Sequence, residues 1–228
     1  MIDKTTLVIA TSNRAKVLEF RLLLADLPLE VVGVADVLFD KPTIAEGSDT
    51  FEENATKKAT TIAEATTMLT LADDSGLEVD ALGGRPGVRS ARFAHDRATD
   101  AENNAALLTA LAEVEQEHRQ ARFRCVLSLV DPWAVPGAEP TIVEGTCEGS
   151  IAREPRGAGG FGYDPLFIVK GRDNTMAELR DEEKNAISHR AVAVGLLKPQ
   201  LARLLEHRAN DALRIVTFRS RNDRQPTT

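Results

Sequence analysis

Two adjacent carboxylates, Asp73 and Asp74, are the residues best suited to chemistry in this sequence. They open the segment DDSG, which we expect to be a polar turn directly after a short strand over residues 69–72. Carboxylate oxygens bind hard divalent cations, and a carboxylate at a strand end can act as a general base. An Asp-rich β-turn without a ligand has the same composition, so the segment alone leaves both interpretations open. Glu46, in an earlier loop, could join the pair at a metal or belong to a solvated acidic loop.

A second group of residues has the composition of an anion-binding turn. An apolar run over residues 6–10 predicts a buried strand, and the polar residues after it favour the start of a helix. Helix N–H groups and the helix dipole attract anions at such a position. A well-capped helix with solvated cations explains the same residues, and the glycine pattern of a P-loop is missing from the segment. The residues concerned are Thr11, Ser12, Asn13, Arg14, Ala15 and Lys16.

Two later segments could recognise a flat polar ligand. The segment GAGGFGYD, residues 157–164, combines glycines that permit close backbone approach with the rings of Phe161 and Tyr163. A nucleobase is one partner for these rings, and the protein core is the other. The segment KNAISHR, residues 184–190, places His189 and Arg190 at a helix start, where the dipole disfavours cations. An anion or polar ligand would compensate for that placement, although an ordinary surface helix start remains possible.

Alternating strands and helices position these groups. Apolar runs predict strands over residues 6–10, 69–72, 123–130, 142–147 and 166–169, with a further strand over 213–218. Helical spacing and cap signals predict helices that start near residues 14, 50, 99 and 188, with the last one kinked or split at Pro199. The interleaved order favours an α/β fold with a mixed sheet.

Length and composition limit the class of protein. The chain has 228 residues with 43% apolar and 28% charged, which predicts one folded domain over residues 1–208 and an extension over 209–228 that ends in a disordered tail. No apolar run reaches the roughly 20 residues of a membrane span, and the N-terminal segment lacks a secretory signal pattern. Two cysteines exclude a disulfide scaffold, so we expect a cytoplasmic protein. A formal net charge of −7 argues against a nucleic-acid partner.

Five segments together resemble the inosine triphosphate pyrophosphatases, the family of non-canonical purine nucleoside triphosphate pyrophosphatases or dITP/XTP diphosphatases. They are LVIATSNRAKVLEF, TFEENATKKA, ADDSGLEVDALGGRPGVRSARFA, IAREPRGAGGFGYDPLF and AELRDEEKNAISHRAVA, which cover about residues 6–205. The resemblance implies an elongated, two-lobed α/β fold with a central mixed sheet flanked by helices and an active site between the lobes. It also implies a homodimer and Mg²⁺-dependent hydrolysis of ITP, dITP and XTP to the monophosphate and pyrophosphate, which removes these nucleotides from the cellular pool.

The resemblance also implies a role for each motif residue. Asp74 would be the general base and a metal ligand, with Glu46 and Asp73 as further metal ligands. Residues 11–16 would bind phosphate, and Ser75 would contact the substrate. The phosphate cations would be Lys58 and Lys184, and the base-binding residues would be Phe161, Gly162, Tyr163, Asp164, His189 and Arg190, with Phe161 as the stacking ring.

Hydrogen bonding gives a reason for base selection. A donor such as Arg190 bonds a 6-oxo group, whereas the 6-amino group of adenine would place two donors face to face, at a cost of roughly 1–3 kcal/mol. Guanine shares the 6-oxo group, and its rejection stays unexplained by the sequence. The alternatives are a Maf-like nucleotide pyrophosphatase, a nucleotide sensor without turnover and a nucleic-acid-binding module. The motifs disfavour the first, the Asp73-Asp74 pair the second and the acidic charge balance the third.

Overall fold

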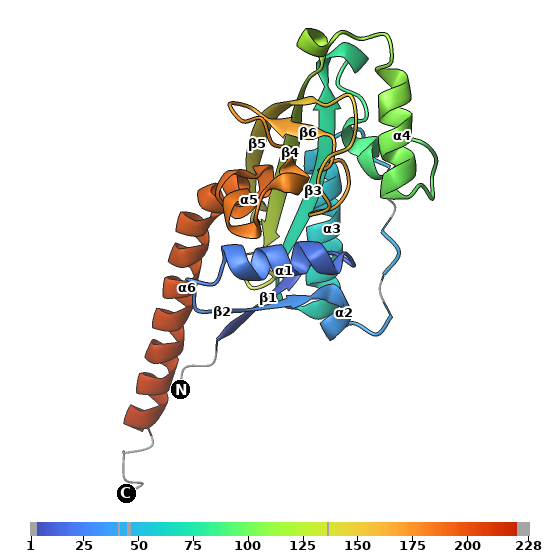
Figure 1. Ribbon diagram of the computed structural model, residues 1–228. Helices are drawn as coiled ribbons and strands as arrows, with labels where there is room; N and C mark the ends of the chain where they lie inside the picture. Colours follow the sequence, from blue (N-terminus) through green and yellow to red (C-terminus); the bar gives the residue numbers. More distant parts are fainter. Residues whose placement is uncertain (1–3, 41, 45–46, 136, 223–228) are drawn as a thin grey trace, which may run out of the picture.

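The computed structural model describes residues 4–40, 42–44, 47–135 and 137–222, and side chains as far as residue 210. Its centre is a six-stranded mixed sheet with the strand order β2-β1-β3-β4-β5-β6 (Figure 1). The three strands β2, β1 and β3 are parallel, and β3 to β6 are antiparallel. The strands are β1 (Thr5–Ile9), β2 (Leu29–Gly33), β3 (Leu69–Val79), β4 (Gln120–Val130), β5 (Thr141–Ile151) and β6 (Phe167–Val169).

Helices flank this sheet. The α-helices are α1 (Arg14–Leu23), α2 (Val34–Val37), α3 (Phe51–Thr66), α4 (Asp100–Ala110), α5 (Asp181–Ile187) and α6 (His189–Asn222). Short 3₁₀ turns are η1 (Asp80–Leu82), η2 (Gly87–Arg92), η3 (Gln116–His118) and η4 (Met176–Glu178). Among the described residues, none of these helices combines the length and the apolar character that a bilayer crossing requires.

Helices α1 and α3 cover opposite faces of the parallel strands. Leu7 and Ile9 of β1 share a core with Phe20 of α1, whereas Val8 shares a core with Ile62 of α3. This division follows from the alternation of side chains along a strand. Because β2 and β3 flank β1 on opposite sides, the chain switches direction at β1. In an open α/β sheet such a switch leaves a crevice beyond the carboxyl end of the strand.

A second core makes the other lobe. It forms around the far halves of β3 and β4, where α4, β5 and β6 contribute apolar side chains. The long antiparallel ribbon of β3 and β4 therefore runs through both lobes and connects them (Figure 1). The expected elongated α/β fold with a mixed sheet is confirmed. Its fully buried side chains include Leu77, Leu107, Leu111 and Phe167.

The prediction of a turn at DDSG was wrong. Strand β3 continues through Asp73 and Asp74 to Val79, with Asp73 opposite Leu127 and Asp74 opposite Val126 of β4. The strand tolerates two carboxylates because cations from distant elements pair with both of them. Strand β2, which lies elsewhere in the chain, was not predicted from the sequence.

The prediction of a strand over residues 213–218 was also wrong. Helix α6 runs for 34 residues without interruption, includes Pro199 and continues to Asn222. In Figure 1 this helix extends away from the sheet toward the C-terminus. A segment that leaves the sheet has no neighbouring strand, and a helix satisfies its backbone hydrogen bonds internally. The division of the chain at residue 208 stays a prediction.

Close packing fixes the start of α6 against β5. The predicted cap is confirmed, since the Ser188 hydroxyl accepts a hydrogen bond from the Ala191 amide at 3.1 Å. A Cβ atom added to Gly145 of β5 would lie 2.3 Å from the His189 carbonyl oxygen and 2.4 Å from the Ala193 nitrogen. Only glycine allows the backbone of α6 to approach the sheet this closely. The first turn of α6, which carries His189 and Arg190, is thereby held in place.

Candidate active site

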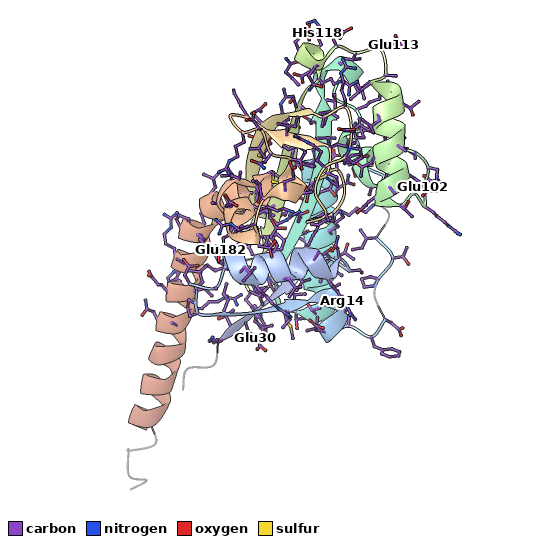
Figure 2. All side chains as sticks on the ribbon, in the orientation of Figure 1. Arg14, Glu30, Glu102, Glu113, His118 and Glu182 are labelled. Carbon is purple, nitrogen blue, oxygen red and sulfur yellow. The ribbon has the colours of Figure 1, made fainter. Side chains whose placement is uncertain are left out.

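A cavity of about 500 Å³ opens beside the carboxyl end of β1, between the two lobes. The sequence motifs meet there although they come from separate helices, strands and loops. The predicted site residues that line the cavity are Thr11, Ser12, Asn13, Lys16, Lys58, Asp73, Asp74, Ser75, Phe161, Gly162, Tyr163, Asp164, Lys184, His189 and Arg190. Arg14 and Ala15 are exposed and do not belong to the lining; Arg14 lies at the outer end of α1 (Figure 2). Glu46 lies outside the described residues.

The start of α1 presents side chains to the cavity, and some of its backbone amides already donate hydrogen bonds to a protein side chain. Asn13 accepts hydrogen bonds from the amides of Ala15 and Lys16 at 2.9 and 3.3 Å. Thr11 accepts one from the amide of Asn13 at 3.2 Å. These bonds fix the turn and leave two helix amides unavailable to a ligand. The attraction for an anion therefore rests mainly on the Lys16 ammonium group and on Lys58 of α3.

Asp73 is buried and fully engaged with protein groups. Its Oδ1 accepts hydrogen bonds from Lys16 Nζ and, at 2.9 Å, from Ser75 Oγ. Its Oδ2 accepts from Arg190 Nε at 2.7 Å and contacts Cys125 Sγ at 3.4 Å. Burial would raise the pKa of Asp73, but Arg190 and Lys16 outweigh it and hold the pKa well below its usual value. Asp73 is thus an ionised anchor for two cations.

Asp74 points to the opposite face of β3 and toward α3. Its Oδ1 accepts a hydrogen bond from Lys58 Nζ at 2.6 Å. Burial raises the pKa of Asp74, and Lys58 opposes only part of that increase. A carboxylate with a raised pKa beside a cavity is a suitable proton acceptor. The neighbouring carboxylates therefore differ in environment, because alternation along the strand separates them.

Two further residues of the cavity lining, His189 and Arg190, each have a buried polar atom without a partner among the described residues. His189 stacks on Phe123, with ring centres 4.9 Å apart, and its Nδ1 has no hydrogen bond within the described part of the chain. Burial and the nearby Arg190 hold the pKa of His189 well below its usual value, so the ring is neutral. Arg190 Nη1 donates to Glu19 at 2.8 Å, whereas its Nη2 is equally unpaired. Unpaired buried polar atoms are rare in folded proteins, and both of these belong to residues that line the cavity, which indicates a polar ligand.

Phe161 lies beside Arg190 in the cavity lining. The Lys184 ammonium and the Arg190 guanidinium lie 5.1 and 5.9 Å from the centre of its ring. Asp164 accepts hydrogen bonds from Lys184 Nζ at 2.7 Å and from the Phe161 amide at 3.1 Å. Lys184 is therefore paired beside the aromatic ring. Tyr163 is anchored to the protein, since its hydroxyl donates to the Ser90 carbonyl at 2.8 Å.

Several residues of the site were not predicted. Arg92, Asp100 and Asn103 also line the cavity. Glu19 supports it from α1, where it accepts hydrogen bonds from Arg190 and from Ser188 Oγ, the latter at 3.4 Å. A sequence signal for Glu19 existed, because it stands among the apolar residues of the segment KVLEF. A charged residue on a buried helix face requires a partner.

The described carboxylates limit how a metal could bind. No three His, Cys, Asp or Glu side chains gather as a metal site within the described ranges. Asp73 already binds four protein groups, so Asp74 is the carboxylate of the pair with capacity for a cation. One carboxylate together with ligand phosphates is an arrangement common for Mg²⁺, and the donor set fits it.

Comparisons with known proteins find similar sequences over most of this chain. Relatives named dITP/XTP pyrophosphatase include a Bacillus subtilis protein, 48% identical over 206 residues that cover 90% of this chain and 100% of the relative. A Geobacillus kaustophilus relative of the same name is 51% identical over 194 residues, covering 85% of this chain and 93% of its own.

Solved structures show the same fold. The HAM1 protein from Coxiella burnetii has a TM-score of 0.77 and 43% identity, covering 87% of this chain and 99% of its own. The nucleoside-triphosphatase / dITP/XTP pyrophosphatase from Mycobacterium abscessus has a TM-score of 0.68 and 41% identity, covering 86% of this chain and 100% of its own. A sequence model of the Ham1 family matches residues 7–200, so the resemblance drawn from the motifs is confirmed and this chain belongs to the Ham1 family.

Proposed function

We propose that this protein hydrolyses non-canonical purine nucleoside triphosphates, namely ITP, dITP and XTP, to the monophosphate and pyrophosphate. One observation carries the proposal: a single cavity is lined by Asp74, Lys16 and Lys58 and also by His189 and Arg190, whose Nδ1 and Nη2 have no partner among the described residues. The names of the relatives from Bacillus and Geobacillus support the same reaction. Hydrolysis of these nucleotides would remove them from the nucleotide pool.

Asp74, Lys16 and Lys58 suit attack of water on the α-phosphorus. Asp74 takes the proton from the attacking water, which contributes typically 10²–10⁴-fold to such a reaction. Negative charge accumulates on the pyrophosphate as it leaves, and Lys16 and Lys58 offset it. The remaining members of the 11–16 segment and Ser75 would contact the phosphates or sugar. Lys184, which the sequence motif assigned to phosphate, is better placed near the nucleobase because it lies over Phe161.

Arg190, His189 and Phe161 suit a 6-oxo purine. Arg190 Nη2 donates to the 6-oxo oxygen, and neutral His189 adds a second polar contact to the base edge. Phe161 stacks on the ring, and Gly162, Tyr163 and Asp164 hold the segment that carries it. Adenine would place its 6-amino donor against Arg190 and leave both groups unpaired. Such a buried unpaired donor costs roughly 1–3 kcal/mol, a discrimination of about 5- to 150-fold.

We propose Mg²⁺ as the cation of this site, with Asp74 as its main protein ligand. When bound, it would neutralise charge on the phosphates and the leaving pyrophosphate. Glu46 stays a proposed further ligand. Asp73 is a weaker candidate than the sequence indicated, because binding a cation would require it to release Lys16 or Arg190.

Further properties stay proposals that rest on the family resemblance and on composition. We expect a homodimer in the cytoplasm. We expect no membrane partner, and the formal net charge of −7 disfavours a nucleic-acid partner.

The reaction is tested by identifying the products formed from ITP in ¹⁸O-labelled water, with Mg²⁺ and with EDTA. We expect IMP that carries the label, unlabelled pyrophosphate, and loss of turnover in EDTA. Release of orthophosphate with IDP would contradict cleavage between the α- and β-phosphates, and label in the pyrophosphate would contradict attack on the α-phosphorus. Tight binding of ITP without any product would favour a nucleotide sensor.

A further inference from the structure

Helix α4 holds both backbone groups of Gly162. The Asp100 carboxylate accepts a hydrogen bond from the Gly162 amide at 2.7 Å, and Asn104 Nδ2 donates to the Gly162 carbonyl at 2.9 Å. Asp100 and Asn104 are four residues apart, so they lie on the same face of the helix. The two contacts join segments that are 62 and 58 residues apart in the sequence.

These contacts restrain the peptide units next to Phe161. The Gly162 N–H belongs to the peptide bond that follows Phe161. The Phe161 N–H belongs to the peptide bond that precedes it, and this N–H donates to the Asp164 carboxylate. Gly162 has φ +64°, a left-handed conformation that glycine adopts without strain. With hydrogen bonds on both sides of Phe161, the backbone that carries its ring has little freedom to turn.

Helix α4 is itself a fixed support. Asn103 accepts a hydrogen bond from the Ala94 amide at 3.0 Å and donates to the Ala91 carbonyl at 3.1 Å, which ties α4 to the segment around η2. Thr99 and Glu102 form a capping box at the start of the helix, and Figure 2 marks Glu102 on α4. Asn104 is buried, whereas Asp100 is exposed.

We propose that Asp100 and Asn104 are positioning residues, which set the ring of Phe161 for the nucleobase through the backbone of Gly162. The inference rests on the proposed function and adds a specificity support that none of the sequence motifs contains. Asp100 and Asn104 act on the base end of the site, whereas Asp74, Lys16 and Lys58 act on the phosphates. Loss of either contact therefore weakens nucleotide binding more than it slows the chemical step.

The test measures KM and kcat for ITP in Asp100→Ala and Asp100→Asn. Asp100→Ala is expected to raise KM about tenfold and to change kcat less than threefold, because a hydrogen bond to a charged group is lost. Asp100→Asn keeps an acceptor oxygen for the Gly162 amide, so most of the loss is expected to be restored. Thr109→Ala, at the other end of α4, is the matched control and should match the unaltered protein. Among the described residues, the Thr109 hydroxyl bonds only to the Ala105 carbonyl of its own helix, at 2.9 Å.

A double-mutant cycle with Phe161→Ala tests the route of the effect. If Asp100 acts through the ring of Phe161, Asp100→Ala adds less than twofold to KM in the Phe161→Ala background. An unchanged KM in Asp100→Ala, a fall confined to kcat, or a full tenfold effect without the ring would each overturn the inference. If the Asn104→Ala variant folds, it should raise KM in the same way. If it does not fold, the Asp100 variants still test the inference, because Asp100 is exposed. Failure of the proposed function has a different result, namely no ITP turnover by the unaltered protein.

Discussion

Asp74→Asn is expected to lower kcat for ITP by about 10²–10⁴-fold with little change in the urea midpoint of unfolding. Asparagine has the shape of aspartate and can still accept the hydrogen bond from Lys58 Nζ, but it cannot take a proton from water. Burial already disfavours the ionised form of Asp74, since it raises the pKa of this carboxyl, so a neutral side chain costs little folding stability. The measurement is pyrophosphate release alongside urea unfolding.

Asp73→Asn is the matched control for Asp74→Asn. It neutralises the neighbouring carboxylate, which is buried and paired with Arg190 and Lys16. Breaking such a pair typically costs about 3–5 kcal/mol, because a buried charge loses its partner. We therefore expect Asp74→Asn to lose turnover and Asp73→Asn to lose folding stability. Turnover near that of the unaltered protein in Asp74→Asn would remove Asp74 from the role of general base.

Arg190→Ala is expected to lower the free energy of unfolding by about 3–5 kcal/mol and to narrow the preference for ITP over ATP. Arg190 is 1% exposed and pairs with both Glu19 and Asp73, so its removal takes a cation away from two buried carboxylates. Among its described partners Asp73 then keeps Lys16 as its only cation, and Glu19 keeps the Ser188 hydroxyl. The unpaired Nη2 that we assign to the 6-oxo group is lost at the same time. The measurements are urea unfolding and kcat/KM for ITP and for ATP.

Arg190→Lys separates the two effects of Arg190→Ala. Lysine keeps a positive charge between Glu19 and Asp73 but lacks the planar group that reaches both carboxylates and the cavity. We expect a smaller loss of stability than in Arg190→Ala and a similar loss of base preference, which should fall by a factor of about 5 to 150. An unchanged ITP/ATP ratio in both variants would place base recognition elsewhere in the cavity.

The local parts of the fold and site were predictable from the sequence. Cap signals predicted the starts of α1, α3, α4 and α6, since a cap depends on residues within one turn. The motif segments also predicted most of the cavity lining, although Arg14 and Ala15 do not reach the cavity. The different environments of Asp73 and Asp74 were not predictable. They depend on Lys16 and Arg190, which stand 57 and 117 residues from Asp73.

The errors have the same physical origin. The segment DDSG favours a turn locally, but pairing with β4 along its whole length makes it a strand. Residues 213–218 are rich in β-branched and apolar side chains, but they continue a helix that has left the sheet. Glu19 was overlooked because its partners, Arg190 and Ser188, are 171 and 169 residues away along the chain. Local preference decides such segments only where no tertiary contact competes with it.

The most direct test of the account is pyrophosphate release from a panel of ITP, XTP, dITP, GTP, ATP, dTTP and UTP under one set of conditions with Mg²⁺. The account predicts strong release from ITP, XTP and dITP and weak release from the other four. Release mainly from pyrimidine nucleotides or from ATP would contradict the recognition of a 6-oxo purine by Arg190 and His189, and release mainly from GTP would contradict the preference for non-canonical purines.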